Sequence, residues 1–358
     1  MVSLNSLHIT GSTAYLLSSE YATYLSGRYV EIKMYPLSFK EFLDFHGYKL
    51  EEYKTPLGQT KWRAIKTHVI KKRAIKIHPA NTAATDTSDE VVELRDLFAA
   101  YMRFGGMPQI ADVGFEQDKA MTLLDGIYST VIVRDILDRE KRRGQRQITD
   151  AGLLCKIVLF LADNIGNNTS LNSISKTLIA ENLLAADTRR SKSAADGARA
   201  AAKPATQTIA SYVAALKESY LFYDVKRFDI KGKEYLRTLG KYYIADIGLR
   251  NYLLGYRGTD TGHALENVVY FELLRRGYDV AVGKIGTLEV DFVATKAAEK
   301  IYVQVTESMT DESVRQRELK PLQKVPDNYQ KMVLTLNRSL DDEYDGIQVV
   351  DVIDWLVS

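Results

Sequence analysis

Residues 151–243 limit the possible folds more than any other stretch, because three helical patterns are followed there by a hairpin pattern. In the first helix, apolar side chains recur at the spacing of one buried face: Leu153, Leu154, Ile157, Val158 and Leu161. Further helical patterns cover residues 171–178 and 208–220. The period then changes to that of a strand at 221–225, and a turn at 229–233 precedes a returning strand. This order predicts a winged helix-turn-helix.

Polar side chains on the third helix and on the hairpin are candidates for nucleic-acid contact. Before and along the helix they are Lys203, Gln207, Thr208, Ser211 and Lys217. On the hairpin they are Lys226, Arg227, Lys231 and Lys233. Basic residues on a wing suit phosphate contact better than base reading. Because winged helices also serve in protein contacts alone, DNA and a protein partner, including a second copy of this chain, stay as alternatives.

The whole chain is nearly neutral, which excludes a general attraction to nucleic acid or membranes. Its 358 residues hold 48 Lys and Arg against 46 Asp and Glu, so any such attraction must come from local patches. The single cysteine, Cys155, excludes an intramolecular disulfide framework, as is usual in a reducing cytoplasm. No apolar run approaches the roughly 18 residues of a membrane span, and no secretory signal opens the chain. We therefore expect a cytoplasmic protein without a membrane partner.

Residues 257–358 form a separate pattern in which a helix precedes a three-stranded meander. The helix lies at 265–274, and a charged helix lies at 313–322. The strand patterns lie at 278–282, 288–294, 301–305, 332–336 and 347–352. This order resembles the restriction-endonuclease-like core. The resemblance implies a D…E-x-K pattern, often with a further Glu on the first helix, in which acids hold Mg²⁺ and a Lys orients the attacking water.

Mapped onto this chain, the nuclease pattern is incomplete. Glu266 matches the helix acid and Asp291 the strand acid, but Gln304 and Thr306 stand where the pattern has Glu and Lys. Glu307 follows directly and should point to the opposite face, because strand side chains alternate. Losing such groups typically costs roughly 10² to 10⁴ in rate each. We therefore predict a nuclease-like fold with a degenerate catalytic site and no resident metal.

Two alternatives stay open for the retained acids. Glu266 and Asp291 could support a weak Mg²⁺-dependent nuclease. Glu266 could instead be a structural residue that pairs with Arg275 or Arg276, or that caps a loop.

The first part of the chain reads as a fragment of an α/β unit. Residues 6–12 resemble the end of a buried parallel strand that runs into a polar turn. A helical pattern follows and ends at a glycine, and Arg28 then precedes another strand. Ser38 and Glu41 form a capping box that opens the next helix.

The middle of the chain is predicted to be mainly helical. Residues 61–78 combine seven basic side chains, no acidic ones and apolar residues at helical spacing. They predict a basic amphipathic helix, which is either a solvated face or a contact for phosphates or an acidic partner. Apolar periods at 91–101 and 119–137 predict a helical lid or bundle. A second basic cluster follows at 139–146.

Seven motifs together resemble a prokaryotic AAA-type ATPase family whose members carry a C-terminal domain of unknown function. They are ITGSTAYLLSSE at 9–20, LSGRY at 25–29, PLSFKEF at 36–42, FGGMP at 104–108, LADNIG at 161–166, DIKGK at 229–233 and LENVVY at 265–270. The resemblance covers nearly the whole chain. It implies that Ser12 and Thr13 lie at the sensor of the γ-phosphate and that Arg28 is a candidate arginine finger.

The nucleotide-binding motif of that family is missing from this sequence. A P-loop needs G-x-x-x-x-G-K-[ST], because backbone amides cradle the phosphates and a Lys neutralises them. No such string occurs, nor does an apolar strand that ends in the acids needed to hold Mg²⁺. Both elements would lie upstream of Met1. We therefore expect this chain to need no cofactor and neither to bind nor to hydrolyse ATP by itself, although the resemblance implies ATP and Mg²⁺ for full-length relatives.

These patterns predict a mixed α/β multidomain protein. Its parts are a partial AAA-type α/β segment at 1–46, a helical lid at 47–147, a winged helix-turn-helix at 148–256 with an inserted loop at 185–204, and a nuclease-like α/β domain at 257–358.

Three functions stay open at this point. The first is a nucleic-acid- or protein-binding module of an AAA-type ATPase-like protein, without ATPase activity of its own. The second is a weak Mg²⁺-dependent nuclease, and the third is an inactive remnant of an ATP-binding protein.

Overall fold

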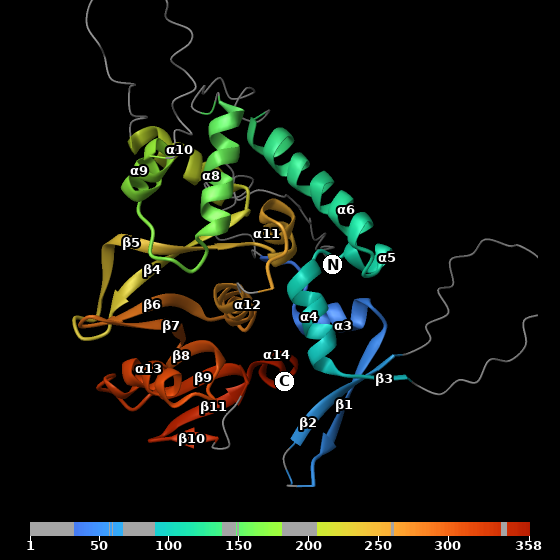
Figure 1. The fold of residues 1–358 in the computed structure, drawn as a ribbon. Helices are drawn as coiled ribbons and strands as arrows, with labels where there is room; N and C mark the ends of the chain where they lie inside the picture. Colours follow the sequence, from blue (N-terminus) through green and yellow to red (C-terminus); the bar gives the residue numbers. More distant parts are fainter. Residues whose placement is uncertain are drawn as a thin grey trace, which may run out of the picture.

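The computed structural model shows a mixed α/β molecule, which confirms the predicted class (Figure 1). It describes residues 32–56, 58, 60–66, 90–137, 148, 150–180, 206–258, 261–337 and 342–358. Several predictions lie outside these residues, namely the sensor residues Ser12 and Thr13, the arginine finger Arg28, and Lys203 before the third helix.

The predicted capping box is confirmed at the start of helix α3 (Phe39–Phe45). The backbone N–H of Glu41 donates to Ser38 Oγ at 3.2 Å, and the backbone N–H of Ser38 donates to Glu41 Oε2 at 2.8 Å. These two bonds satisfy N–H groups that the first helical turn cannot satisfy itself. The helix thereby begins at a fixed residue and buries its apolar face.

A three-stranded antiparallel sheet follows α3 and extends away from the rest of the molecule (Figure 1). Its strands are β1 (Tyr48–Lys54), β2 (Thr60–Lys66) and β3 (Glu90–Val92). The helix predicted from residue 61 onward is therefore wrong over the described part of that stretch. Cross-strand pairing with β1, which includes an ion pair between Arg63 and Glu51 at 2.6 Å, prevails over the helical spacing of the side chains.

The helices predicted from the apolar periods at 91–101 and 119–137 are confirmed. The helical region consists of α4 (Leu94–Phe104), α5 (Ile110–Val113) and α6 (Gln117–Ser129), and α6 continues as a π-helix, η1 (Thr130–Leu137). The predicted turn at 105–108 follows α4 directly.

Two glycines after α4 allow the chain to pack closely against Asp246. Gly105 has φ +79°, and a Cβ there would lie 2.1 Å from Asp246 Oδ1. The backbone N–H of Gly106 donates to Asp246 Oδ2 at 2.6 Å. Asp246 also caps helix α11 (Ile247–Leu254) by accepting from the backbone N–H of Leu249 at 3.1 Å. This carboxylate therefore joins the helical region to α11.

Replacing Asp246 with asparagine is expected to change how stability depends on pH. Burial raises the pKa of Asp246 to about 6, so the folded state holds the proton more tightly than the unfolded state between about pH 4 and 6. The wild type should therefore lose about 3 kcal/mol across this window as pH rises, at 1.36 kcal/mol per pKa unit. Asp246→Asn should not show this loss. Denaturant unfolding at pH 4.5 and 7.5 measures the difference, and parallel changes in both proteins would contradict the assignment.

The helices and hairpin predicted between residues 151 and 243 are confirmed. The helices are α8 (Ala151–Asp163), α9 (Leu171–Ala180) and α10 (Thr206–Glu218), and the hairpin consists of β4 (Phe222–Asp229) and β5 (Glu234–Ile244). The hairpin strands are longer than predicted. In addition, β4 pairs in parallel with β6 (Asp279–Ile285), which no local pattern indicated.

One eight-stranded sheet results, with the order β10-β11-β9-β8-β7-β6-β4-β5. It crosses the predicted domain boundary at residue 256. The further strands are β7 (Leu288–Lys296), β8 (Glu299–Ser308), β9 (Gln330–Asn337), β10 (Glu343–Tyr344) and β11 (Ile347–Asp351). The helices of this part are α12 (Thr261–Arg275), α13 (Glu312–Gln323) and α14 (Val352–Val357). The predicted meander and its two helices are thus confirmed, whereas β10 and α14 were not predicted.

Helices α12 and α13 cover opposite faces of this sheet. Phe292 packs in the same hydrophobic cluster as Leu265 of α12, whereas its neighbour Val293 packs with Leu319 and Leu322 of α13. Neighbouring strand residues point to opposite faces, so the two clusters lie on the two sides of the sheet. Within the described residues, no helix combines the length and the apolar composition needed to cross a membrane.

Candidate functional site

One lysine and three carboxylates converge between the hairpin, α12 and β7. Lys241 Nζ lies 3.2 Å from Glu266 Oε2, 3.0 Å from Glu289 Oε1 and 3.7 Å from Asp291 Oδ1. The Lys241 side chain is only 4% exposed. We call these four residues the lysine–carboxylate cluster. The structure therefore brings together Glu266 and Asp291, as predicted, and adds Lys241 and Glu289.

The strands and α12 hold the cluster in place. Glu289 and Asp291 are two residues apart on β7, so their side chains share one face of the sheet. On β5, Tyr243 lies two residues after Lys241, and its hydroxyl donates to Glu266 Oε2 at 3.0 Å. The Asn267 amide then makes two 2.9 Å hydrogen bonds with the backbone of Ile244, which fix α12 against β5.

Gln304 occupies the position where the nuclease pattern has a glutamate, and it makes two hydrogen bonds there. Its Oε1 accepts from the backbone N–H of Asp291 at 3.3 Å, and its Nε2 donates to Glu318 Oε2 on α13 at 2.9 Å. Both Gln304 and Glu318 are buried. Asp291 Oδ2 accepts from the backbone N–H of Val305 at 2.9 Å, which fixes the carboxylate of Asp291.

Thr306 and Glu307 on β8 point to opposite faces of the sheet, as the alternation of strand side chains predicts. Thr306 is buried, and Glu307 is exposed. The alternative pairing of Glu266 with Arg275 or Arg276 is wrong, because both arginines pair with Glu272, at 3.7 and 2.9 Å.

Burial and mutual charge set the protonation states in the cluster. Burial alone lowers the pKa of Lys241, but Glu266 and the other two acids outweigh it and raise this pKa. Burial likewise opposes charge on Glu266, but Lys241 and His263 outweigh it and lower its pKa. For Asp291, burial and the nearby charge of Glu266 raise the pKa. These shifts in pKa favour the charged forms of Lys241 and Glu266 and the protonated form of Asp291.

The residues present do not fit the Mg²⁺ that the resemblance to a nuclease core implies. Magnesium needs oxygen ligands at about 2.0–2.1 Å in near-octahedral geometry. Here the ammonium of Lys241 lies between the acids at ion-pair distances, and Gln304 replaces the third acid of the pattern. Among the residues that the structure describes, no group of three or more His, Cys, Asp or Glu side chains could hold a metal ion.

One of the three residues missed at the sequence level has a recognisable signal. Glu289 precedes Asp291 by two residues on a strand, a spacing that places both on one face. Glu318 lies on the predicted charged helix, where an acidic residue would be expected at the surface. Only the fold reveals that it is buried. Lys241 has no sequence signal, because it reaches the acids from a different part of the chain.

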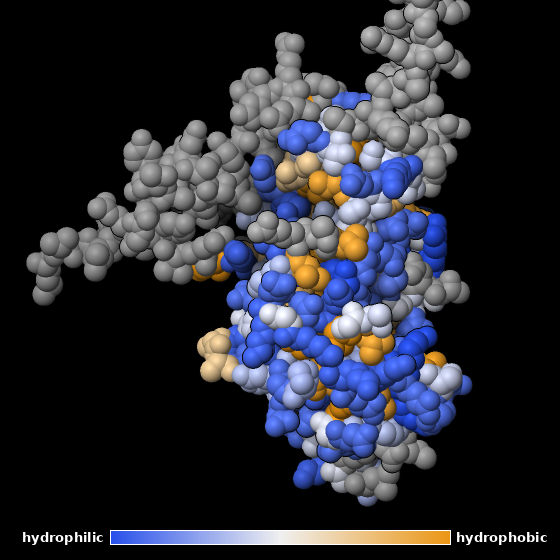
Figure 2. Space-filling view, turned by 90° about the vertical axis from the view of Figure 1, so that its left-hand side faces the viewer, coloured by the Kyte–Doolittle hydropathy of each residue, from blue (hydrophilic) through white to orange (hydrophobic). Residues whose placement is uncertain are grey.

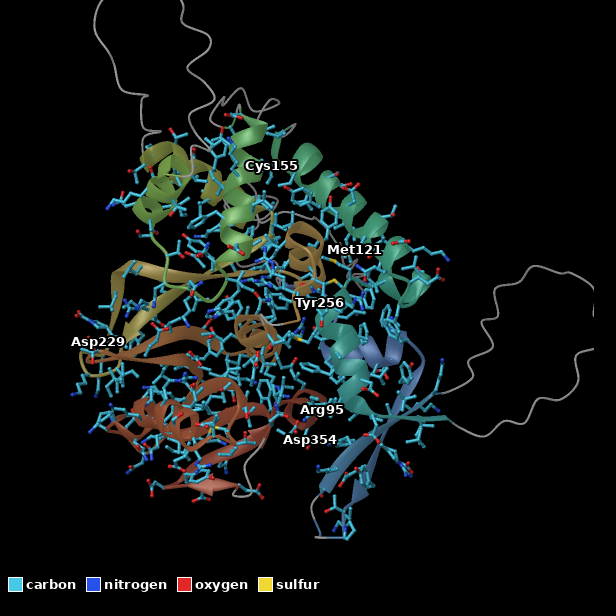
Figure 3. All side chains as sticks on the ribbon, viewed as in Figure 1. Arg95, Met121, Cys155, Asp229, Tyr256 and Asp354 are labelled. Atoms are coloured by element: carbon cyan, nitrogen blue, oxygen red, sulfur yellow. The ribbon has the colours of Figure 1, made fainter. Side chains whose placement is uncertain are left out.

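The hairpin turn presents two of the predicted phosphate contacts. Lys231 and Lys233 are exposed, and Figure 3 places the neighbouring Asp229 at the outer end of the hairpin. Asp229 Oδ1 accepts from the backbone N–H groups of Lys231 and Gly232, both at 3.0 Å. These bonds lower the pKa of Asp229. Lys226 on β4 is also exposed.

Other predicted contact residues already have partners within the chain. The guanidinium of Arg227 is mostly buried and lies 3.9 Å from Glu289 Oε2. On α10, Lys217 pairs with Asp224 of β4 at 2.8 Å, and the Ser211 hydroxyl donates to the backbone oxygen of Thr208 at 2.8 Å. Among the predicted contacts on the described part of α10, Gln207 is exposed, whereas Thr208, Ser211 and Lys217 are partly buried.

Comparison with known proteins identifies two family models along the chain. A model described as an AAA domain matches residues 4–43, and one described as a domain of unknown function (DUF8612) matches residues 95–260. No solved structure matches the chain.

Two curated relatives match almost the entire chain. An uncharacterized protein of Methanocaldococcus jannaschii is 28% identical over 367 residues, which cover 98% of this chain and 68% of that protein. An uncharacterized protein of Haemophilus influenzae is 36% identical over 349 residues, which cover 98% of this chain and 70% of that protein. At this identity and coverage, the chain belongs to the same protein family as the Haemophilus influenzae protein.

Proposed function

We propose that this chain is a nucleic-acid-binding module of an AAA-type ATPase-like protein and that the β4–β5 turn contacts phosphates. The observation that carries the proposal is the exposed lysine pair, Lys231 and Lys233, on a turn whose backbone is held by Asp229. A lysine is a point charge that can neutralise a phosphate without reading the base sequence.

The fixed turn supports binding in a second way. The two backbone hydrogen bonds to Asp229 order the turn before any ligand arrives. Less conformational entropy is then lost when the lysines contact a phosphate backbone.

The surrounding surface also suits a polyanion better than an apolar partner. Figure 2 shows the side of the molecule on which the hairpin lies, and its described surface is mainly hydrophilic with small, separated hydrophobic areas. Arg227 and Lys217 already pair with acidic side chains of this chain. We therefore assign phosphate contact to Lys226, Lys231 and Lys233, with Gln207 on helix α10. Thr208, Ser211 and Lys203 stay as secondary candidates.

The AAA part of the proposal rests on the match over residues 4–43. The roles of Ser12 and Thr13 as sensor and of Arg28 as arginine finger belong to this proposal. Because the sequence holds no P-loop string, we assign no ATP hydrolysis to this chain by itself.

Removing the two lysines of the turn is expected to weaken binding to duplex DNA and to flatten its salt dependence. Each phosphate contact contributes about 0.9 to the slope of log affinity against log salt, so Lys231→Ala/Lys233→Ala should lower the slope by about 1.8. Fluorescence anisotropy with a labelled duplex across a salt series measures both quantities.

Lys320→Ala/Lys324→Ala removes the same charge from exposed positions at α13 and serves as the control. Equal losses in the two double variants would overturn the assignment to the turn. Undetectable binding of the wild type at low salt would overturn nucleic-acid binding and leave a protein-binding module or an inactive remnant.

A further inference from the structure

We propose that Tyr235 is a stacking platform for an unpaired base, so that the β4–β5 hairpin binds nucleic acid preferentially where base pairing is interrupted. The inference rests on the proposed function, because the lysines of the turn must first hold the phosphate backbone. It adds which form of nucleic acid the same site selects.

The ring of Tyr235 is exposed and is positioned by a partly buried neighbour. Tyr235 is 58% exposed, although it lies on a strand of the large sheet. It pairs across the hairpin with Phe228, and the two ring centroids lie 5.3 Å apart with 64° between the ring planes. Phe228 in turn packs against the hydrophobic cluster that contains Ile285 and Val290. Because an edge-to-face contact orients both rings, the hairpin presents the Tyr235 ring to solvent in a defined position.

Exposed lysines lie close to Tyr235 on both strands of the hairpin. Lys233 comes two residues before Tyr235, and Lys226 comes two residues before its partner Phe228. Lys231 is exposed in the turn between the strands. Proteins that bind single strands combine basic side chains along the backbone with aromatic rings on which bases stack. The hairpin carries both kinds of group within a few residues.

The acidic residues of this segment are directed away from the Tyr235 ring. Asp229 Oδ1 accepts from the backbone N–H groups of Lys231 and Gly232, both at 3.0 Å. Glu234 directly precedes Tyr235 on β5, so its side chain points to the other face of the strand. A negatively charged strand can therefore pass the ring without facing the Glu234 carboxylate.

Within the described residues, the loop at 166–169 covers only a later part of the β5 edge. Strand β5 is the last strand of the sheet. The backbone N–H of Thr169 donates to the Gly240 oxygen at 2.8 Å, and that of Gly166 donates to the Tyr242 oxygen at 3.1 Å. These bonds lie beyond Tyr235 along β5, so a nucleotide can approach the ring from the edge of the sheet.

An exposed ring selects unpaired bases because bases within a duplex are already stacked. Both faces of a paired base are covered by its neighbours, whereas an unpaired base can turn one face to a protein side chain. Such stacking tolerates any base sequence, since every base has a π-face. Lysines contact the phosphates of paired and unpaired strands alike. The lysines therefore supply affinity for both forms, and Tyr235 supplies the preference.

The test compares two labelled duplexes of equal length and phosphate number, one fully paired and one with a short central run of mismatched pairs. Fluorescence anisotropy with the full chain should show tighter binding of the wild type to the mismatched duplex. Tyr235→Ala should weaken that binding by about 5-fold to 100-fold, the usual effect of losing one stacked base. Its binding to the paired duplex should change by less than about twofold, because the phosphate contacts remain.

Three further variants separate stacking from charge and from folding. Tyr235→Phe keeps an aromatic ring and should keep the preference. Tyr235→Leu keeps an apolar contact with Phe228 but has no ring, so it should lose the preference even if Tyr235→Ala does not fold. Tyr329→Ala is the control, because Tyr329 is 45% exposed and lies beside Lys300 at the opposite end of the sheet. It should bind both duplexes as the wild type does.

The salt dependence provides an independent readout. Tyr235→Ala should leave the slope of log affinity against log salt unchanged, whereas Lys231→Ala/Lys233→Ala should lower it for both duplexes. Equal binding of the two duplexes by the wild type would overturn the role of Tyr235 and leave phosphate contact by the turn intact. A preference that persists in Tyr235→Leu would also overturn it. If the wild type binds neither duplex, the proposed function fails, and this inference fails with it.

Discussion

Replacing Lys241 with methionine is expected to destabilise the fold by about 3–5 kcal/mol, the usual cost of removing one partner from a buried ion pair. Methionine keeps most of the length of the side chain and leaves no large cavity. The loss therefore reports the uncompensated charge on Glu266 and its neighbours. Denaturant unfolding at pH 7 measures the change in the free energy of unfolding.

A surface ion pair provides the matched control for this prediction. Lys217 and Asp224 lie 2.8 Å apart, but their side chains are 38% and 37% exposed. Lys217→Met should therefore cost less than about 1 kcal/mol. A second test adds Glu266→Gln to Lys241→Met, which should recover part of the loss because one buried charge is then removed. Similar small losses for both lysines would contradict a buried, tightly paired Lys241.

Replacing Gly106 with alanine is expected to cost about 3 kcal/mol, the upper end of what overpacking usually costs. A Cβ at this position would lie 2.3 Å from the backbone oxygen of Leu37. Backbone atoms cannot turn away as the end of a side chain can. In addition, the backbone N–H of Leu37 donates to the Gly106 oxygen at 2.7 Å, so a shift would also disturb that bond.

Gly126 offers the opposite case within the same helical region. It lies in α6, and a Cβ there would have no atom within 4 Å. Gly126→Ala should therefore leave the fold unchanged or stabilise it by about 0.5–1 kcal/mol, because alanine favours the helix. Both variants are compared by thermal unfolding. A Gly106→Ala protein as stable as the wild type would show that the 105–108 turn is not as tightly packed as described.

Most helices and strands could be predicted because each is encoded by its own local period. Helix α12 and strands β6 to β9 all lie close to the predicted ranges, and the capping box of Ser38 and Glu41 begins α3 as expected. Local signals of this kind do not depend on what the segment later packs against.

Pairing between distant segments could not be predicted in the same way. Residues 60–66 have helical spacing of their side chains, but they form a strand because β1 and β3 pair with them. The parallel pairing of β4 with β6 likewise joins segments that are more than 50 residues apart. Only the fold determines such neighbours.

The candidate site likewise contains residues that could be predicted from the sequence and residues that only the fold brings together. The resemblance placed Glu266 and Asp291 together, although they are 25 residues apart, because a known arrangement of elements supplied the missing geometry. Lys241 was missed because it comes from the hairpin, outside that arrangement. Arg227 and Lys217 were predicted as phosphate contacts because their charge is visible in the sequence, whereas their acidic partners are not.

The continuous sheet gives the hairpin a mechanical role. The turn at 229–233 and Lys241 belong to one hairpin. Lys241 pairs with Val225 and Glu234 pairs with Asp229, so the turn and Lys241 lie four residues apart along β4, about 13 Å at roughly 3.3 Å per residue. A pull on the turn would act along β5 on the buried ion pairs and, through β4, on the backbone bonds to β6. The hairpin is therefore anchored at two places, by β6 beside the turn and by the ion pairs of Lys241 further along β5, so a force at the turn would act on β6, α12 and β7 together.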